Sequence, residues 1–140
     1  MNAAVFDTNV LVSGILSPHG PPGYLVEGLL DGWLRAVLDD RILDEYREVL
    51  SRPSFGFDAG DIASLLHRIT RLAIWPALNA GVVDVKSLPD PDDAPFLICA
   101  ASAGVPLVTG NLRHFPKKAV GVVSVLSPAS FWHRLPREVG

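Results

Sequence analysis

The sequence lacks several features that mark particular classes of protein. Its 140 residues include one cysteine, Cys99, so neither an internal disulfide nor a metal site of several thiolates can form. Charged residues make up only 19% of the chain and hydrophobic residues 49%, a balance opposite to that of disordered proteins. The longest apolar run, around residues 96–101, is far shorter than the roughly 18 residues that a membrane helix needs. We therefore expect one folded domain over residues 1–140 and no membrane partner.

A strong positive charge is also missing. The net charge is −3, which argues against a globally basic nucleic-acid-binding protein but leaves room for a local basic patch. The first residues show no basic segment followed by a cleavable apolar stretch, so we expect no secretory signal and a cytoplasmic protein. The two turn-forming clusters, residues 17–23 and 88–93, are too short for domain linkers and are interpreted as loops.

Short apolar runs that alternate with helical stretches are typical of an α/β fold. Strands are expected at residues 3–6, 34–38, 72–75, 106–109 and 122–126, with a minor extended piece at 82–85. Helices are expected at residues 10–16, 22–31, 40–51, 58–71 and 93–103, with one more from Pro128. Short buried strands joined by helices predict a central parallel sheet of about five strands.

Two polar residues lie just after expected strands, one directly and one beyond Gly110. Asp7 comes after residues 3–6, and Asn111 comes after residues 106–109. Ligands of open parallel sheets bind beyond the carboxyl ends of the strands, which makes both residues site candidates. Each also has a structural interpretation, because Asp7 is suited to cap the next helix and Asn111 to form a turn. As a site residue, Asn111 would supply a neutral oxygen ligand or an amide that orients water.

Further acids lie on expected helices. In the helix at 40–51, Glu45 borders the apolar stripe and can lean toward a cleft, or it can lie in solvent paired with Arg41 or Arg52. At the start of the helix at 93–103, Asp93 borders the apolar face while Asp92 points away. Asp93 is therefore either a helix cap or an inward-facing site residue.

The combination is more informative than any one member. If the topology is right, Asp7, Glu45, Asp93 and Asn111 project from the same edge of the sheet. Two unit charges about 4 Å apart repel by about 4 kcal/mol at an effective dielectric constant of about 20, so such carboxylates need a proton, separation or a cation. All-oxygen ligands favour Mg²⁺ or Mn²⁺, and such ions suit phosphodiester hydrolysis.

The local basic cluster of the chain follows Asn111. It consists of Arg113, His114, Lys117 and Lys118. These residues either hold an RNA backbone beside the cleft or form an ordinary solvated loop, and the sequence favours neither interpretation.

Four runs of residues together resemble the PIN-domain nucleases, most closely the VapC-like toxins of toxin–antitoxin systems. These are the runs at residues 6–13 (FDTNVLVS), 43–46 (LDEY), 90–93 (DPDD) and 108–115 (VTGNLRHF). The resemblance covers roughly residues 1–132. It implies a three-layer α/β/α sandwich and an Mg²⁺- or Mn²⁺-dependent ribonuclease that cleaves single-stranded RNA. It also implies an antitoxin partner and a homodimer.

The resemblance assigns roles residue by residue. It implies that Asp7, Glu45 and Asp93 are the catalytic acids and metal ligands, with Glu45 or Asp93 helping to deprotonate water. Thr8 and Asn9 would orient Asp7 or water, and Asp90 would be an auxiliary ligand. Many members of the family have aspartate where this chain has Asn111, which puts a second metal position in doubt.

Two alternatives stay open. A phosphatase that forms an aspartyl phosphate on Asp7 usually has a second aspartate two residues later, where this chain has Asn9, and a lysine for which Lys117 is poorly placed. A catalytically silent PIN-like module that binds RNA or protein is compatible with Asn111. The presence of all three acids argues against it.

Overall fold

A parallel β-sheet forms the centre of the protein. The computed structural model describes residues 2–136, and within them the sheet has four strands in the order β2-β1-β3-β4. The strands are β1 (Asn2–Phe6), β2 (Leu34–Ala36), β3 (Leu107–Val108) and β4 (Val125–Leu126). Val5 pairs with Leu107 in the register of β1 and β3. The parallel α/β architecture predicted from the sequence is therefore confirmed.

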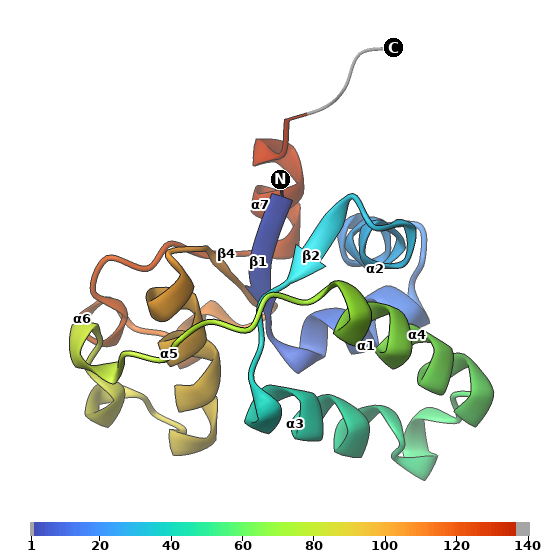
Figure 1. Cartoon of the computed structure of the whole chain (residues 1–140), viewed down its shortest axis with the longest axis horizontal. Helices are drawn as coiled ribbons and strands as arrows, with labels where there is room; N and C mark the ends of the chain where they lie inside the picture. Colours follow the sequence, from blue (N-terminus) through green and yellow to red (C-terminus); the bar gives the residue numbers. More distant parts are fainter. Residues whose placement is uncertain (1, 137–140) are drawn as a thin grey trace.

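Helices pack on both sides of the sheet, and Figure 1 shows α5 and α6 on the opposite side of β1 from α2 and α4. The helices are α1 (Thr8–Leu16), α2 (Pro21–Asp31), α3 (Asp40–Leu50), α4 (Ala59–Leu72), α5 (Ala94–Ala103), α6 (Lys117–Val120) and α7 (Pro128–Arg134). Short 3₁₀ turns include η4 (Pro91–Asp93) and η5 (Leu112–His114). In the described residues, none of these helices combines the length and apolar character needed to cross a membrane.

The hydrophobic patterns explain which helix faces are buried. Helix α4 buries Ile62, Leu65, Leu66 and Ile69, which recur at helical spacing. Helix α5 packs against β1 and β3 and buries five consecutive residues, Phe96–Ala100, so its apolar surface extends well beyond a single stripe. This burial anchors the start of α5 beside the end of β1.

Two expected strands are corrected by the structure. The segment at 72–75 forms a single bridge, between Ile74 and Val37, because α4 extends to Leu72 and leaves few residues for pairing. The segment at 82–85 is not a strand and is flanked by the 3₁₀ turns η2 (Ala80–Val82) and η3 (Val85–Ser87). The backbone N–H of Asp84 donates to the carbonyl of Ala119 in α6, so this segment pairs with a helix end instead of a strand.

Candidate active site

Asp7 lies at the carboxyl end of the central strand β1. Its backbone N–H donates to the carbonyl of Val108 at 2.9 Å, which continues the pairing of β1 with β3. Its side chain is buried, and one carboxylate oxygen, Oδ2, accepts hydrogen bonds from the Thr109 hydroxyl at 2.8 Å and from the Asn9 amide at 3.4 Å. Although Asp7 occupies the N-cap position of α1, its side chain makes no capping hydrogen bond with that helix in the described structure.

Glu45 is brought to the same edge by the docking of α3 against β1. The hydroxyl of Tyr46, a fully buried residue, donates to the carbonyl of Phe6 at 2.5 Å. The preceding residue, Glu45, is half-buried and accepts a hydrogen bond from the hydroxyl of Thr8. Since Phe6 and Thr8 flank Asp7 in the chain, α3 places Glu45 next to it.

The surface ion pairs considered for Glu45 are made by other acids. Arg41 binds Asp39, with its Nη2 3.0 Å from the carboxylate, and Arg52 binds Glu48 at 2.9 Å. Of the two interpretations that the sequence left open, the hydrogen bond from Thr8 favours the one in which Glu45 leans toward the site.

Asp93 enters the site from the start of α5. It is 8% exposed, and like Asp7 it occupies an N-cap position without making a capping hydrogen bond to its helix in the described residues. Asp90 supplies the local cap instead, because its side chain accepts from the backbone N–H of Asp92 at 2.9 Å. The Asp93 carboxylate lies 3.0 Å from Nδ1 of His114.

The turn after β3 completes the site. The Thr109 side chain is fully buried. Its hydroxyl group accepts a hydrogen bond from the backbone N–H of Asn111 at 3.0 Å and donates one to the carboxylate of Asp7. The backbone N–H of Gly110 donates to the side-chain carbonyl of Asn9 at 3.1 Å. These bonds fix Asn111 at the sheet edge, beside Asp7.

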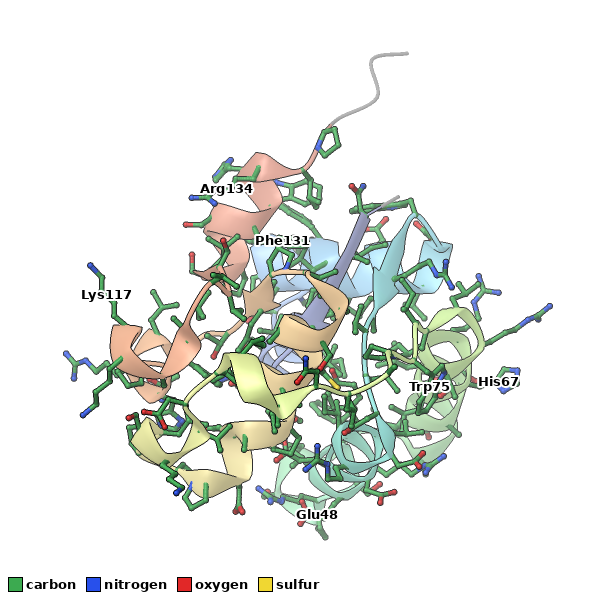
Figure 2. The ribbon with its side chains drawn as sticks, turned by 60° about the vertical axis from the view of Figure 1, so that its left-hand side comes forward. Glu48, His67, Trp75, Lys117, Phe131 and Arg134 are labelled. Atoms are coloured by element: carbon green, nitrogen blue, oxygen red, sulfur yellow. The ribbon has the colours of Figure 1, made fainter. Side chains whose placement is uncertain are left out.

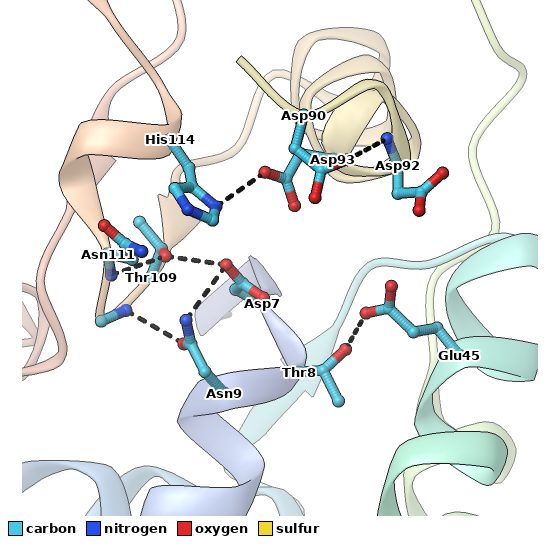
Figure 3. Close-up of polar contacts among 11 residues, drawn as sticks. Asp7, Thr8, Asn9, Glu45, Asp90, Asp92, Asp93, Thr109, Asn111 and His114 are labelled. Atoms are coloured by element: carbon cyan, nitrogen blue, oxygen red, sulfur yellow. Dashed lines mark hydrogen bonds and ion pairs between the residues drawn. The ribbon is translucent and has the colours of Figure 1, made fainter. Parts of the chain in front are cut away.

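Figure 3 shows the carboxylates of Asp7, Glu45 and Asp93 directed toward a shared space from β1, α3 and α5. Burial raises the pKa of Asp7 and of Glu45, and the charge of Asp7 raises the pKa of Glu45 further. Burial and the charge of Asp7 raise the pKa of Asp93 to about 6, against the opposing effect of His114. The fold therefore concentrates negative charge where it is poorly hydrated.

The donor set is made of oxygen atoms and suits a hard divalent cation. Among the described residues no three histidine, cysteine, aspartate or glutamate side chains lie close enough together to enclose an ion. Mg²⁺ commonly uses only one or two protein carboxylates and completes its octahedron with water and substrate phosphate. Asp7 and Asp93 meet that requirement in residue type and in their placement around a shared space.

The four residues of the basic cluster lie in different environments. Arg113, Lys117 and Lys118 are exposed, and Lys117 extends away from the protein in Figure 2. His114 instead turns inward to Asp93. Because it extends away from the protein, Lys117 makes no hydrogen bond or ion pair with Asp7 in the described residues, of the kind that the lysine of an aspartyl-phosphate phosphatase would make.

The contacts of Thr109 and His114 with the acids were not anticipated from the sequence. Both residues belong to the run at 108–115, but Thr109 is 102 positions from Asp7 and His114 is 21 positions from Asp93. One sequence feature could have indicated the contact between Thr109 and Asp7. Thr109 has a hydroxyl group and ends the expected strand at 106–109, and Asp7 follows the expected strand at 3–6.

A family model described as PIN domain matches residues 3–113, which include β1 through β3 and all four predicted acid or amide positions. The chain belongs to the PIN-domain family. PIN domains are generally nucleases, so the family supports a hydrolase role for this PIN domain. The comparison with curated proteins gave no match.

Proposed function

We propose that this PIN domain is a metal-dependent endoribonuclease that hydrolyses phosphodiester bonds in single-stranded RNA in the cytoplasm. The observation that carries the proposal is the pair of buried carboxylates, Asp7 and Asp93, at one edge of the sheet. Neither caps its helix, and the pKa of each is raised by burial. Carboxylates whose pKa values are raised by burial and that lie together at the end of a strand are typical of functional sites.

The proposed direct ligands of an Mg²⁺ or Mn²⁺ ion are Asp7 and Asp93. Glu45 is proposed as the third acid of the metal site, although in the described residues the three carboxylates do not lie close enough together to enclose an ion. When bound, a divalent ion would lower the pKa of water and neutralise the charge that develops on the phosphate. Burial and, after it, repulsion by the charge of Asp7 raise the pKa of Asp93, and both effects favour this role because a bound cation would offset them.

The other residues of the site have orienting and proton-transfer roles in the proposal. Glu45, whose pKa is raised and which is half-buried, accepts a proton from the attacking water. Thr8 orients Glu45, and Asn9 orients Asp7. Asn111 contributes a neutral amide at the sheet edge, where it orients water or the phosphate.

Asp90 has a smaller part in the proposed site. Its carboxylate caps the turn that leads into Asp93, and it raises the pKa of that residue. We propose it as an auxiliary residue of the metal site.

Exposed cations beside the site are proposed to bind the RNA backbone. Arg113 lies within the turn η5, Lys117 and Lys118 begin α6, and all three side chains are exposed. Each phosphate contact to a single strand contributes about 0.7 to the slope of log affinity against log salt. Replacing Lys117 and Lys118 by alanine is expected to reduce that slope and to weaken binding of all sequences similarly.

The decisive experiment is cleavage of unstructured RNA with Mg²⁺ or Mn²⁺, with and without EDTA. Replacing Asp7 or Asp93 by asparagine is expected to lower the rate at least about 100-fold, since even residues outside the ligand shell commonly contribute 10- to 100-fold. Glu45→Gln should also reduce the rate, whereas Asp44→Asn on the exposed face of α3 should not. Circular dichroism checks that each variant is folded.

Other results would favour the alternatives. Undiminished cleavage in the Asp7 and Asp93 variants, or cleavage insensitive to EDTA, contradicts the proposal. RNA binding without cleavage, together with no Mn²⁺ binding at millimolar concentration, identifies a silent module, which the neutral Asn111 would suit. A trapped phosphoenzyme on Asp7 identifies a phosphatase.

We further propose that the protein is the toxin of a toxin–antitoxin pair and a homodimer, on the likeness of its four sequence runs to VapC-like toxins. Induced expression in a bacterial host should then arrest growth, and Asp7→Asn should abolish the arrest. Co-expression of the neighbouring reading frame should restore the growth of cells that express the wild-type protein. Sedimentation tests the dimer independently of cleavage.

A further inference from the structure

One short segment after β3 contacts both of the buried carboxylates. At its first residue, Thr109 donates to Asp7 at 2.8 Å, and five residues later His114 lies 3.0 Å from Asp93. The two acids come from different elements, the end of β1 and the start of α5. Residues 109–114 are thus a common support for two side chains that are 86 positions apart.

The segment itself is held by its own hydrogen bonds. The backbone N–H of Asn111 donates to Thr109 at 3.0 Å, and that of His114 donates to the carbonyl of Asn111 at 3.2 Å. Gly110 is tied to Asn9 of α1 at 3.1 Å. The position of the imidazole is therefore determined by the same turn that orients Asp7.

We infer that His114 is a positioning residue that holds the Asp93 carboxylate toward the space it shares with Asp7. The Asp93 side chain is 12% exposed, and the imidazole that contacts it is 41% exposed. The start of α5 does not need this contact, because Asp93 does not cap the helix in the described structure and Asp90 caps the preceding turn. His114 also lies just beyond the residues that match the family model.

The contact can be tested without any metal. We would record the imidazole ¹⁵N signals of His114 in the metal-free protein labelled at histidine. The signals are expected to shift in Asp93→Asn and to stay in place in Asp90→Asn, which removes a neighbouring carboxylate bonded to Asp92. Unchanged His114 signals in Asp93→Asn would overturn the inference, whatever the protein's activity.

The positioning role rests on the proposed metal site and is tested by Mn²⁺ titration calorimetry. His114→Phe keeps a ring but loses the nitrogen, and its affinity is expected to fall about 10-fold, in the range known for residues that orient metal ligands. His114→Asn, whose amide nitrogen takes a place similar to Nδ1, should recover most of the affinity. His133→Ala on α7 is the control for loss of an exposed histidine and should bind like the wild type.

The outcomes separate the inference from the proposal on which it rests. Wild-type or tighter Mn²⁺ binding in His114→Phe overturns the positioning role, because the ring then only packs against Asp93 or competes with the ion. If Asp7→Asn binds Mn²⁺ like the wild type, the proposed metal site is wrong, and so is the part of the inference that concerns metal affinity. In that case the ¹⁵N signals alone still test whether His114 contacts Asp93.

Discussion

In the described part of the chain, four α-helices have an aspartate at the N-cap position, and these aspartates form two pairs that differ in their contacts. At the starts of α3 and α4, Asp39 and Asp58 each accept a hydrogen bond from the backbone N–H three residues later, at 3.0 and 2.9 Å. At the starts of α1 and α5, Asp7 and Asp93 make no such bond in the described residues and are buried. Their carboxylates contact side chains of another element, Thr109 and His114.

The difference shows that the position of an aspartate at the start of a helix does not determine the role of its carboxylate. A capping carboxylate is engaged by the backbone and stabilises its own helix. Asp7 and Asp93 instead carry raised pKa values and face a shared space, so the protein is less stable with them ionised than with a cation bound. We interpret the contrast as a difference between carboxylates that cap helices and carboxylates of the proposed metal site, and the following experiments test it.

The largest effect on stability is expected from metal binding. An ion at 100 times its dissociation constant stabilises the folded state by about 2.7 kcal/mol. Mn²⁺ should therefore raise the melting temperature of the wild type and of Asp39→Asn, but not that of Asp7→Asn. Thermal unfolding in Mn²⁺ and in EDTA measures this, and an equal rise in all three proteins would erase the distinction between the two pairs.

A smaller effect is expected from removing the charge of Asp93 in the metal-free protein. Its folded pKa is about 6, raised from 3.8, so the folded state binds the proton more tightly and loses stability as the pH rises between about 4 and 6. Above that window Asp93→Asn should be more stable than the wild type by about 1–2 kcal/mol. This is less than the free energy that corresponds to a pKa shift of about two units, because the site is partly solvated.

Urea unfolding in EDTA at pH 4 and pH 8 provides the measurement. The gain should be confined to pH 8, since at low pH the wild-type carboxyl group is protonated and resembles the amide. A gain that is the same at both pH values would mean that packing, and not charge, destabilises the wild type.

The smallest effect is expected at a capping residue. Asp39→Ala should lower the free energy of unfolding by about 1 kcal/mol, because the backbone N–H of Ile42 loses its partner, and Asp39→Ser should restore most of it. Urea unfolding at pH 7 measures the change. If Asp7→Ala showed the same loss and the same rescue by serine, Asp7 would be a cap after all.

Much of this architecture could be predicted because it depends on local patterns. The apolar stripe of α4, the burial of α5 and the place of Asp7 at the end of a strand follow from residue order and helical or strand periodicity. The position of Glu45 at the border of the apolar stripe of α3 allowed an inward or a solvated side chain, so the helical pattern alone did not decide its orientation. The segment at 72–75, by contrast, forms only one bridge in the described residues, from Ile74 to Val37 just after β2. No local sequence pattern indicates that its pairing stops there.

Residue order thus determined the parallel α/β class, most helix boundaries and the edge at which the acids gather. Assembly of the sheet determined the partner of each acid: Thr109 meets Asp7 because β3 lies beside β1, and His114 meets Asp93 because the turn after β3 passes the start of α5. Such contacts depend on strand register and on how helices pack across the sheet. Periodicity along the chain carries no information about either, since it describes each element separately.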